Sequence, residues 1–160
     1  MNILVTGGAG YIGSHTSLCL LNKGYNVVII DNLINSSCES IRRIELIAKK
    51  KVTFYELNIN NEKEVNQILK KHKFDCIMHF AGAKSVAESL IKPIFYYDNN
   101  VSGTLQLINC AIKNDVANFI FSSSATVYGE SKIMPVTEDC HIGGTLNPYG
   151  TSKYISELMI

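Results

Sequence analysis

The stretch Thr6-Gly7-Gly8-Ala9-Gly10-Tyr11-Ile12-Gly13 decides the fold because of its place in the chain. It follows a short apolar run, Ile3–Thr6, and opens a helical pattern, Ile12–Lys23. Glycines at these spacings let the backbone turn tightly and approach a pyrophosphate, and a helix N-terminus offers unpaired N–H groups and partial positive charge. The stretch therefore predicts the strand, turn and helix that open a dinucleotide-binding sheet.

The composition is that of one globular domain. The chain has 160 residues, of which 46% are hydrophobic and 18% charged, enough to bury a core without disulfides. A net charge of +1 predicts no nucleic-acid partner and no anionic membrane surface. The N-terminus lacks the features of a signal peptide, and no apolar run approaches the ~20 residues of a membrane span, so we expect a cytoplasmic protein. Five cysteines without a C-x-x-C pair predict no metal site.

Short β-rich runs alternate with helical patterns along the whole chain, which predicts a parallel sheet. The expected strands are Ile3–Thr6, Asn26–Ile30, Val52–Leu57, Cys76–Phe80 and Asn118–Ser122. The expected helices are Ile12–Lys23, Glu39–Lys50, Glu62–His72, Ile94–Lys113 and one that opens near Pro148. The pattern predicts an α/β fold, a Rossmann-like doubly wound parallel sheet with helices on both faces.

Two further segments stand out in this pattern. The longest expected helix places Tyr97, Val101, Leu105, Ile108 and Ile112 on one apolar stripe. Residues 123–146 show neither the apolar pattern of a strand nor that of a helix, which predicts a long loop between a strand and a helix. Open α/β sheets bind their ligands at such strand ends.

An acidic residue supports the glycine-rich turn. Asp31 ends the second expected strand, 18 residues after Gly13. A carboxylate there accepts hydrogen bonds from the adenosine ribose and repels a 2′-phosphate, which predicts NAD rather than NADP as the cofactor. Alternatively, Asp31 has a purely structural role, in which its side chain caps a helix or a turn.

A possible proton-transfer pair lies near the end of the chain. Tyr149 and Lys153 are spaced i, i+4, so their side chains share one helix face and the ammonium favours the phenolate. Ser124, after the fifth expected strand, is placed to hydrogen-bond the same substrate hydroxyl. A Y-x-x-x-K pair alone is common on solvated helices. It indicates proton transfer here because the same chain also has the predicted dinucleotide-binding turn.

Together these segments resemble the N-terminal part of the UDP-glucose 4-epimerases, which are extended short-chain dehydrogenase/reductases. The resemblance is carried by VTGGAGYIGSHT, DNLINS, HFAGAKSVAES, YYDNNVSGTL, NFIFSSSATVYGE and NPYGTSK. It implies that Tyr149 is the catalytic base, that Lys153 lowers its pKa and holds the nicotinamide ribose, and that Ser124 assists at the substrate.

The resemblance also implies a set of cofactor contacts. They fall on Gly7, Gly10, Tyr11, Ile12 and Gly13 at the pyrophosphate, on Asp31, Asn32 and Asn35 at the adenosine ribose, and further on Ile59, Phe80, Ala81, Lys84 and Asn99. One position departs from the family pattern, which has an aspartate that contacts adenine where this chain has Asn58. We therefore expect an altered adenine contact at Asn58.

The activity implied is interconversion of UDP-galactose and UDP-glucose, part of galactose metabolism, by transient hydride transfer to tightly bound NAD through a 4-keto sugar. The partner would be a UDP-hexose, and the full-length form would be a homodimer. Residues 1–160 would be an incomplete NAD-binding domain that ends shortly after Lys153, with the C-terminal substrate domain missing. The isolated chain is then expected to bind NAD with little turnover.

Two alternatives remain open. Nucleotide-sugar 4,6-dehydratases use the same hydride step, but they place acidic residues where this chain has Ala125 and Thr126. A truncated NAD-binding module without turnover is the second alternative, and the short length favours it. The presence of Ser124, Tyr149 and Lys153 argues against it.

Overall fold

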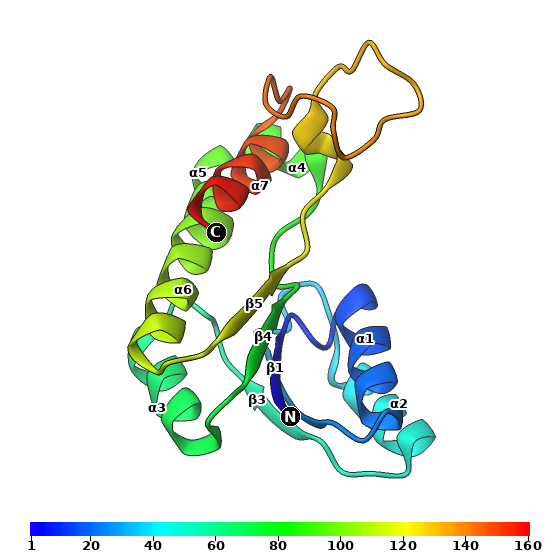
Figure 1. Ribbon diagram of the computed structural model, residues 1–160, viewed down its shortest axis with the longest axis vertical. Coiled ribbons are helices and arrows are strands. Elements are labelled where there is room, and N and C mark those ends of the chain that lie inside the picture. The colour runs from blue at the N-terminus through cyan, green and yellow to red at the C-terminus, as the bar shows by residue number, and fades with distance from the viewer. The chain divides into compact units, whose positions relative to one another are not determined.

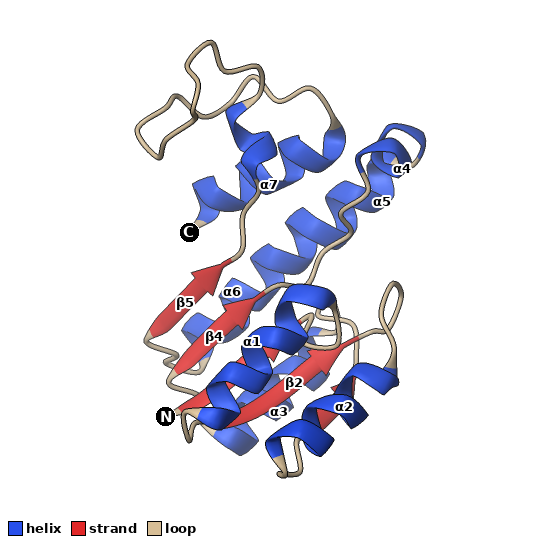
Figure 2. Cartoon of the chain, turned by 90° about the vertical axis from the view of Figure 1, so that its right-hand side faces the viewer, coloured by secondary structure: helices blue, strands red, loops and turns tan.

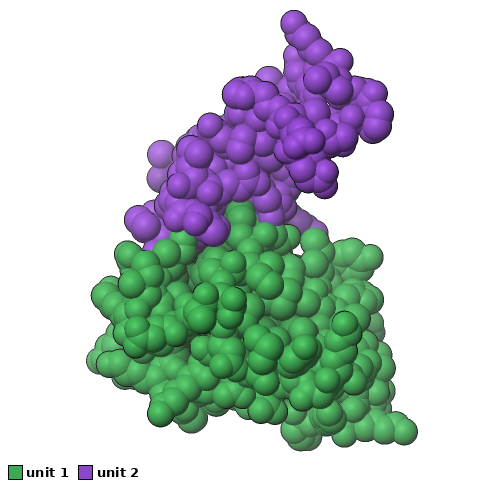
Figure 3. Space-filling model, viewed as in Figure 1, with its two compact units in different colours: residues 1–82, 106–122 green, residues 83–105, 123–160 purple.

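The computed structural model describes all 160 residues, which form two compact units (Figure 3). Unit 1 comprises residues 1–82 and 106–122, and unit 2 comprises residues 83–105 and 123–160. Helix α6 (Gly103–Lys113) begins in unit 2 and continues in unit 1.

Unit 1 is built on a five-stranded sheet in which every neighbouring pair of strands is parallel (Figure 1). The strand order is β3-β2-β1-β4-β5. The bounds are Asn2–Thr6 for β1, Asn26–Asp31 for β2, Thr53–Glu56 for β3, Cys76–His79 for β4 and Asn118–Phe121 for β5. After β3 the chain crosses to the other side of β1, so the order reverses between β1 and β4. Such a switch point, at the carboxyl ends of the strands, is where these sheets bind ligands.

Helices cover both faces of this sheet (Figure 2). One face packs against α1 (Tyr11–Asn22) and α2 (Cys38–Ala48) around a cluster that includes Val5, Leu21 and Ile44. The other packs against α3 (Glu62–His72) and α6 around a second cluster that includes Ile77 and Leu107. The predicted doubly wound sheet, with helices on both faces, is therefore confirmed.

One buried polar pair ties the centre of the sheet together. Thr6 and His79 are fully buried, neighbouring residues on β1 and β4. The Thr6 hydroxyl lies 2.6 Å from Nδ1 of His79. A hydroxyl and an imidazole in the core must be hydrogen-bonded, because leaving either unpaired costs its full desolvation.

Unit 2 contains several short helical elements and one longer helix. They are α4 (Val86–Ile91), α5 (Pro93–Tyr96), the first turn of α6, the 3₁₀ turn Ala125–Tyr128 and α7 (Pro148–Met159). The sequence pattern did not predict α4 or the 3₁₀ turn. Pro148 does open α7, whose N-cap Asn147 accepts a hydrogen bond from the Gly150 N–H.

The helix expected over Ile94–Lys113 is confirmed in its extent, because the backbone is helical without a break from Pro93 to Lys113, but it is not a regular α-helix. A π-helical turn, Tyr97–Ser102, separates α5 from α6. The buried side chains are Tyr96, Asn100, Thr104, Leu107, Cys110 and Ala111. Each residue of the predicted apolar stripe follows one of these buried residues by one position. The stripe is partly exposed to solvent, with Leu105 46% and Ile112 69% exposed.

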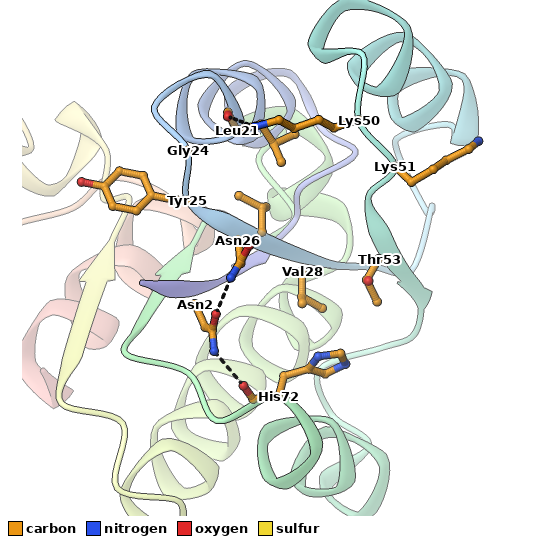
Figure 4. Close-up of a pocket in the computed structure, with 11 residues that line it drawn as sticks. Asn2, Leu21, Gly24, Tyr25, Asn26, Val28, Lys50, Lys51, Thr53 and His72 are labelled. Atoms are coloured by element: carbon orange, nitrogen blue, oxygen red, sulfur yellow. Dashed lines mark hydrogen bonds between the residues drawn. The ribbon is translucent and has the colours of Figure 1, made fainter.

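A pocket at the amino ends of β1–β3 lies at the edge of the sheet opposite the glycine-rich turn (Figure 4). Three of its polar side chains bind one another or the backbone. Asn26 donates to the Asn2 side chain, Asn2 donates to the His72 carbonyl, and the Lys50 ammonium donates to the Leu21 carbonyl. These bonds fasten strand starts to helix ends, and we assign the pocket a structural role.

The buried Thr6–His79 contact predicts a matched pair of variants. Thr6→Val keeps the volume but removes the hydroxyl, so it should lower the free energy of unfolding by about 1–3 kcal/mol. Thr6→Ser keeps the hydroxyl and should lose clearly less. Urea unfolding followed by circular dichroism measures both, and equal losses for the two variants would contradict this role of the hydroxyl.

Candidate functional site

The glycine-rich turn lies at the switch point, and at two of its glycines neighbouring backbone occupies the space of a side chain. A Cβ on Gly7 would lie 2.5 Å from the backbone nitrogen of Ala81, which follows β4, and Gly7 also has a φ of +70°. A Cβ on Gly13 would overlap the carbonyl oxygen of Gly7. The turn therefore packs directly on the end of β4 and on the first turn of α1. This is the backbone cradle that a pyrophosphate requires.

The Asp31 carboxylate ends β2 beside this turn and is 7% exposed. One oxygen accepts the Ala9 N–H at 3.0 Å, and the other accepts the Leu33 N–H at 2.9 Å and the Ser36 hydroxyl at 2.7 Å. Asp31 thus joins the glycine-rich turn to the loop after β2, as a turn cap does. A carboxylate has about four acceptor positions, so one is left for a ribose hydroxyl.

The other expected cofactor residues of unit 1 differ in how far their side chains are exposed to solvent. Tyr11 and Ile12 are 76% and 55% exposed at the start of α1, and Asn35 is also exposed. Asn32 is half-buried, and its side chain accepts the Ile34 N–H. The Ile59 side chain is buried in the core, which leaves its main chain for a ligand.

Two loops complete the carboxyl edge of the sheet. After β4, the Phe80 N–H donates to the Thr6 carbonyl, and Ala81 lies against Gly7. After β3, Asn58 is exposed and its side-chain oxygen accepts the Asn60 N–H at 3.0 Å. The structure therefore brings the glycine-rich turn, the end of β2 and the loops after β3 and β4 to one edge of unit 1.

In unit 2, helix α7 carries Tyr149 and Lys153 one turn apart. Tyr149 is half-buried, and its ring packs at nearly a right angle against Tyr96, with 6.5 Å between the centroids. Burial lowers the pKa of Lys153 from 10.5 to about 8, and the carboxylate of Glu157 raises it slightly in return. A buried lysine with a lowered pKa is a mark of functional sites.

Ser124 lies at the N-cap of the 3₁₀ turn that packs against α7. Its hydroxyl accepts the Thr126 N–H at 3.3 Å and lies 2.9 Å from the Thr126 hydroxyl. A Cβ on Gly150 would lie 3.3 Å from Thr126, so Gly150 allows α7 to approach this turn. Unit 2 thus places Ser124 and the Tyr149–Lys153 face on adjoining elements.

The remaining two expected cofactor residues also lie in unit 2. Lys84 is exposed beside α4, and Asn99 is half-buried in the π-helical turn. The Asn99 amide donates to Asn100, a buried neighbour that sequence reasoning missed. Asn100 bonds both backbone groups of Ala83 and donates to the Ser152 hydroxyl, so it ties the π-helical turn to α7.

Tyr96 was also missed, although it is fully buried beneath Tyr149. Its hydroxyl donates to the Glu88 carboxylate at 2.9 Å and accepts the Ser85 N–H at 3.0 Å. Burial and the Glu88 carboxylate raise the pKa of Tyr96, which keeps it neutral. The only sequence signal for Tyr96 and Asn100 was their spacing of four residues.

The parallel sheet with its glycine-rich turn at the switch point defines a Rossmann-like α/β protein. The model of the family described as GDP-mannose 4,6 dehydratase matches residues 4–160, and the chain belongs to that family. No helix is both long enough and apolar enough to span a membrane.

Individual relatives carry another name. The chain is 55% identical to a UDP-glucose 4-epimerase of Haemophilus influenzae and 54% identical to one of Yersinia enterocolitica, in each case over all 160 residues. It superposes with a TM-score of 0.97, at 48% identity, on a UDP-glucose 4-epimerase of Bifidobacterium longum solved with NAD⁺ and UDP. The match covers 99% of this chain and 48% of that structure. The chain likewise spans 47–48% of the two sequence relatives, about half their length.

The backbone cradle predicts a difference between two glycine substitutions. Gly13→Ala places a methyl group against the Gly7 carbonyl, whereas a Cβ on Gly10 would lie 3.2 Å from the same oxygen, a far smaller conflict. Gly13→Ala should therefore lower the melting temperature by several degrees more than Gly10→Ala. Differential scanning fluorimetry compares the two variants. A Gly10→Ala loss as large as that of Gly13→Ala would show that the close approach is not limiting.

The buried Lys153 predicts a pH-dependent stability difference. Its pKa falls on folding from 10.5 to about 8, so the unfolded chain binds more protons between these values. Burying the Lys153 charge therefore lowers the free energy of unfolding by its full amount below pH 8, and by less and less as the pH rises towards 10.5. Lys153→Met should stabilise the chain by about 2–3 kcal/mol at pH 7, and the gain should shrink by pH 10. Urea titrations of both proteins across this range measure the difference, and a constant gap would refute it.

Proposed function

We propose that this chain forms the NAD-binding and proton-transfer part of a UDP-glucose 4-epimerase. The main observation behind the proposal is that Lys153 is buried one helical turn after Tyr149. The same chain also has the glycine-rich cradle at the switch point of its sheet. The two sequence relatives and the B. longum structure, all named UDP-glucose 4-epimerase, support it. The substrates would be UDP-galactose and UDP-glucose, so the protein would act in galactose metabolism.

The residues of unit 1 would hold the cofactor. The N–H groups at the start of α1 bind the pyrophosphate, and the free acceptor position of Asp31 binds the adenosine ribose. Because the Asp31 carboxylate also bonds Ala9, cofactor binding and the shape of the turn depend on the same side chain. A 2′-phosphate would meet this carboxylate, which favours NAD over NADP.

The residues of unit 2 would move the proton. Bound NAD would supply reversible hydride transfer at C4 of the hexose. Tyr149 takes the proton of the C4 hydroxyl and later returns it, and Ser124 hydrogen-bonds the same oxygen. Protonated Lys153 favours the phenolate of Tyr149 and holds the nicotinamide ribose.

The family description favours a second candidate, a nucleotide-sugar 4,6-dehydratase. Elimination of water from the sugar requires a further acid and base next to the proton-transfer tyrosine. After Ser124 this chain has Ala125 and Thr126, and neither can supply a carboxylate. We therefore prefer epimerisation.

A homodimer of the full-length protein is part of the same proposal. The apolar stripe along the π-helical turn and α6 is partly exposed in this chain, with Leu105 and Ile112 most open to water. Contiguous apolar surface of this kind is typical of protein interfaces. A second copy that covered the stripe would remove it from solvent.

The isolated chain should bind NAD without catalysing the reaction. We expect calorimetry to show NAD binding that exceeds NADP binding at least tenfold, and no conversion of UDP-galactose in an assay coupled to UDP-glucose dehydrogenase. Robust turnover by the 160-residue chain would overturn its assignment as a part of the enzyme.

A fusion tests the epimerase assignment directly. The chain would be joined to the half of the H. influenzae relative that it does not match. The fusion should convert UDP-galactose, and Tyr149→Phe in the same fusion should lower kcat by about 10²-fold or more while the NAD content stays unchanged. A 4-keto-6-deoxy sugar as the product would instead identify a dehydratase.

A further inference from the structure

Tyr149 lies where its own helix gives its side chain little support. It is the second residue of α7 and is half-buried. A side chain on a helix points back over the turn that precedes it. No turn of α7 precedes Tyr149, so neighbouring elements must set the orientation of its ring. Helix α7 packs against α4, α5, the π-helical turn and the 3₁₀ turn, which are the elements that can do so.

The ring of Tyr96 supplies this support. Tyr96 ends α5 and is fully buried. Its ring lies at 83° to the ring of Tyr149, with 6.5 Å between the centroids. Aromatic rings attract one another in this arrangement because the positive edge of one ring meets the negative face of the other. Since this attraction depends on the angle between the rings, a fixed Tyr96 ring favours one position of the Tyr149 ring.

The Tyr96 ring is itself held at both ends. Helix α5 fixes the end at Cα. At the other end, the hydroxyl donates to Oε2 of Glu88 at 2.9 Å and accepts the Ser85 N–H at 3.0 Å. Glu88 is fixed in turn, because the Lys92 ammonium donates to its other oxygen at 3.1 Å. The ring therefore cannot move away from α7 unless these bonds break.

The Tyr96 hydroxyl also fixes the segment that carries Lys84, an expected cofactor residue. Asn100 bonds both backbone groups of Ala83, on one side of Lys84. Tyr96 bonds the N–H of Ser85, on the other side. Through its hydroxyl and its ring, one buried side chain thus sets the backbone around one expected site residue and the orientation of another.

We propose that Tyr96 is a positioning residue, which holds the Tyr149 phenol in the orientation that proton transfer with a substrate hydroxyl requires. Its ring selects the χ1 rotamer of Tyr149, and its hydroxyl keeps that ring in place. A reacting group that is displaced by about 1 Å can lose about 10²-fold in rate. The inference rests on the proposed role of Tyr149 in epimerisation, and Tyr96 acts through Tyr149.

The rotamer of Tyr149 tests the positioning on the 160-residue chain itself. Three-bond couplings from the backbone nitrogen and carbonyl carbon to Cγ, measured by NMR, report whether χ1 occupies one staggered position or several. The Tyr149 signals are assigned by their loss in Tyr149→Phe. Wild type and Tyr96→Phe should show one rotamer, whereas Tyr96→Leu, which removes the ring, should show averaged couplings. Averaged couplings in wild type, or a single rotamer in Tyr96→Leu, would refute the inference.

Tyr97→Leu is the matched control. It removes the same ring and hydroxyl from the next residue, which is half-buried in the π-helical turn. Tyr149 should keep its single rotamer in this variant. Equal averaging in Tyr96→Leu and Tyr97→Leu would show that any cavity near α7 frees the Tyr149 ring, and this result contradicts a specific role of Tyr96.

The fusion described above shows whether the orientation matters for turnover. Tyr96→Leu should lower kcat by about tenfold or more, while the KM for UDP-galactose and the NAD content change little. Tyr96→Phe, which keeps the ring, should retain most of the kcat. A loss confined to KM, or an equal loss of kcat in the two variants, would contradict the role of the ring. If Tyr149→Phe leaves kcat unchanged in the same fusion, the proposed function fails and the inference fails with it, whatever the rotamer of Tyr149.

Discussion

The close approach of backbone to backbone at the switch point is the constraint on which the sheet edge depends. Gly7 lies against Ala81, and Gly13 lies against the Gly7 carbonyl, at distances that a side chain would not permit. Two segments that are remote in sequence, the glycine-rich turn and the end of β4, therefore meet without any side chain between them. The free N–H groups of α1 are left facing outward at the point where the strand order reverses. A larger residue at Gly7 would push the turn away from the end of β4, and one at Gly13 would push α1 away from the turn.

Much of unit 1 could be predicted from the sequence because its elements are buried in a regular way. Strands covered on both faces are nearly continuous apolar runs, and each predicted strand was correct to within a residue or so at its ends. Helix α3 was predicted over its full range, Glu62–His72. The role of Asp31 at the end of β2 was more open, and the structure shows it capping the turn. Its contact with a ribose stays a prediction.

Unit 2 was harder to predict because its buried surface is partly polar. The buried positions Tyr96, Asn100 and Thr104 of unit 2, followed by Leu107 and Ala111 of unit 1, have the same spacing as the apolar stripe one residue later. Hydrophobicity alone selects the later set, since the buried set contains an amide and a hydroxyl. Those groups are buried because they are hydrogen-bonded, Asn100 to Ala83 and Ser152 and Thr104 to the Asn100 carbonyl. The partners of Asn100 are 17 and 52 residues away in the sequence, so no local pattern reveals that this amide is buried.

The π-helical turn has a consequence for how this segment tolerates changes in length. Each residue of an α-helix advances the direction of its side chain by about 100°. A π-helical turn, with hydrogen bonds from i to i+5, holds about one residue more than an α-helical turn. Deleting one residue from Tyr97–Ser102 should therefore leave an ordinary α-helical turn, with the side chains before and after it in their present directions. Insertions and deletions of other lengths should be confined to the exposed loop of residues 130–139.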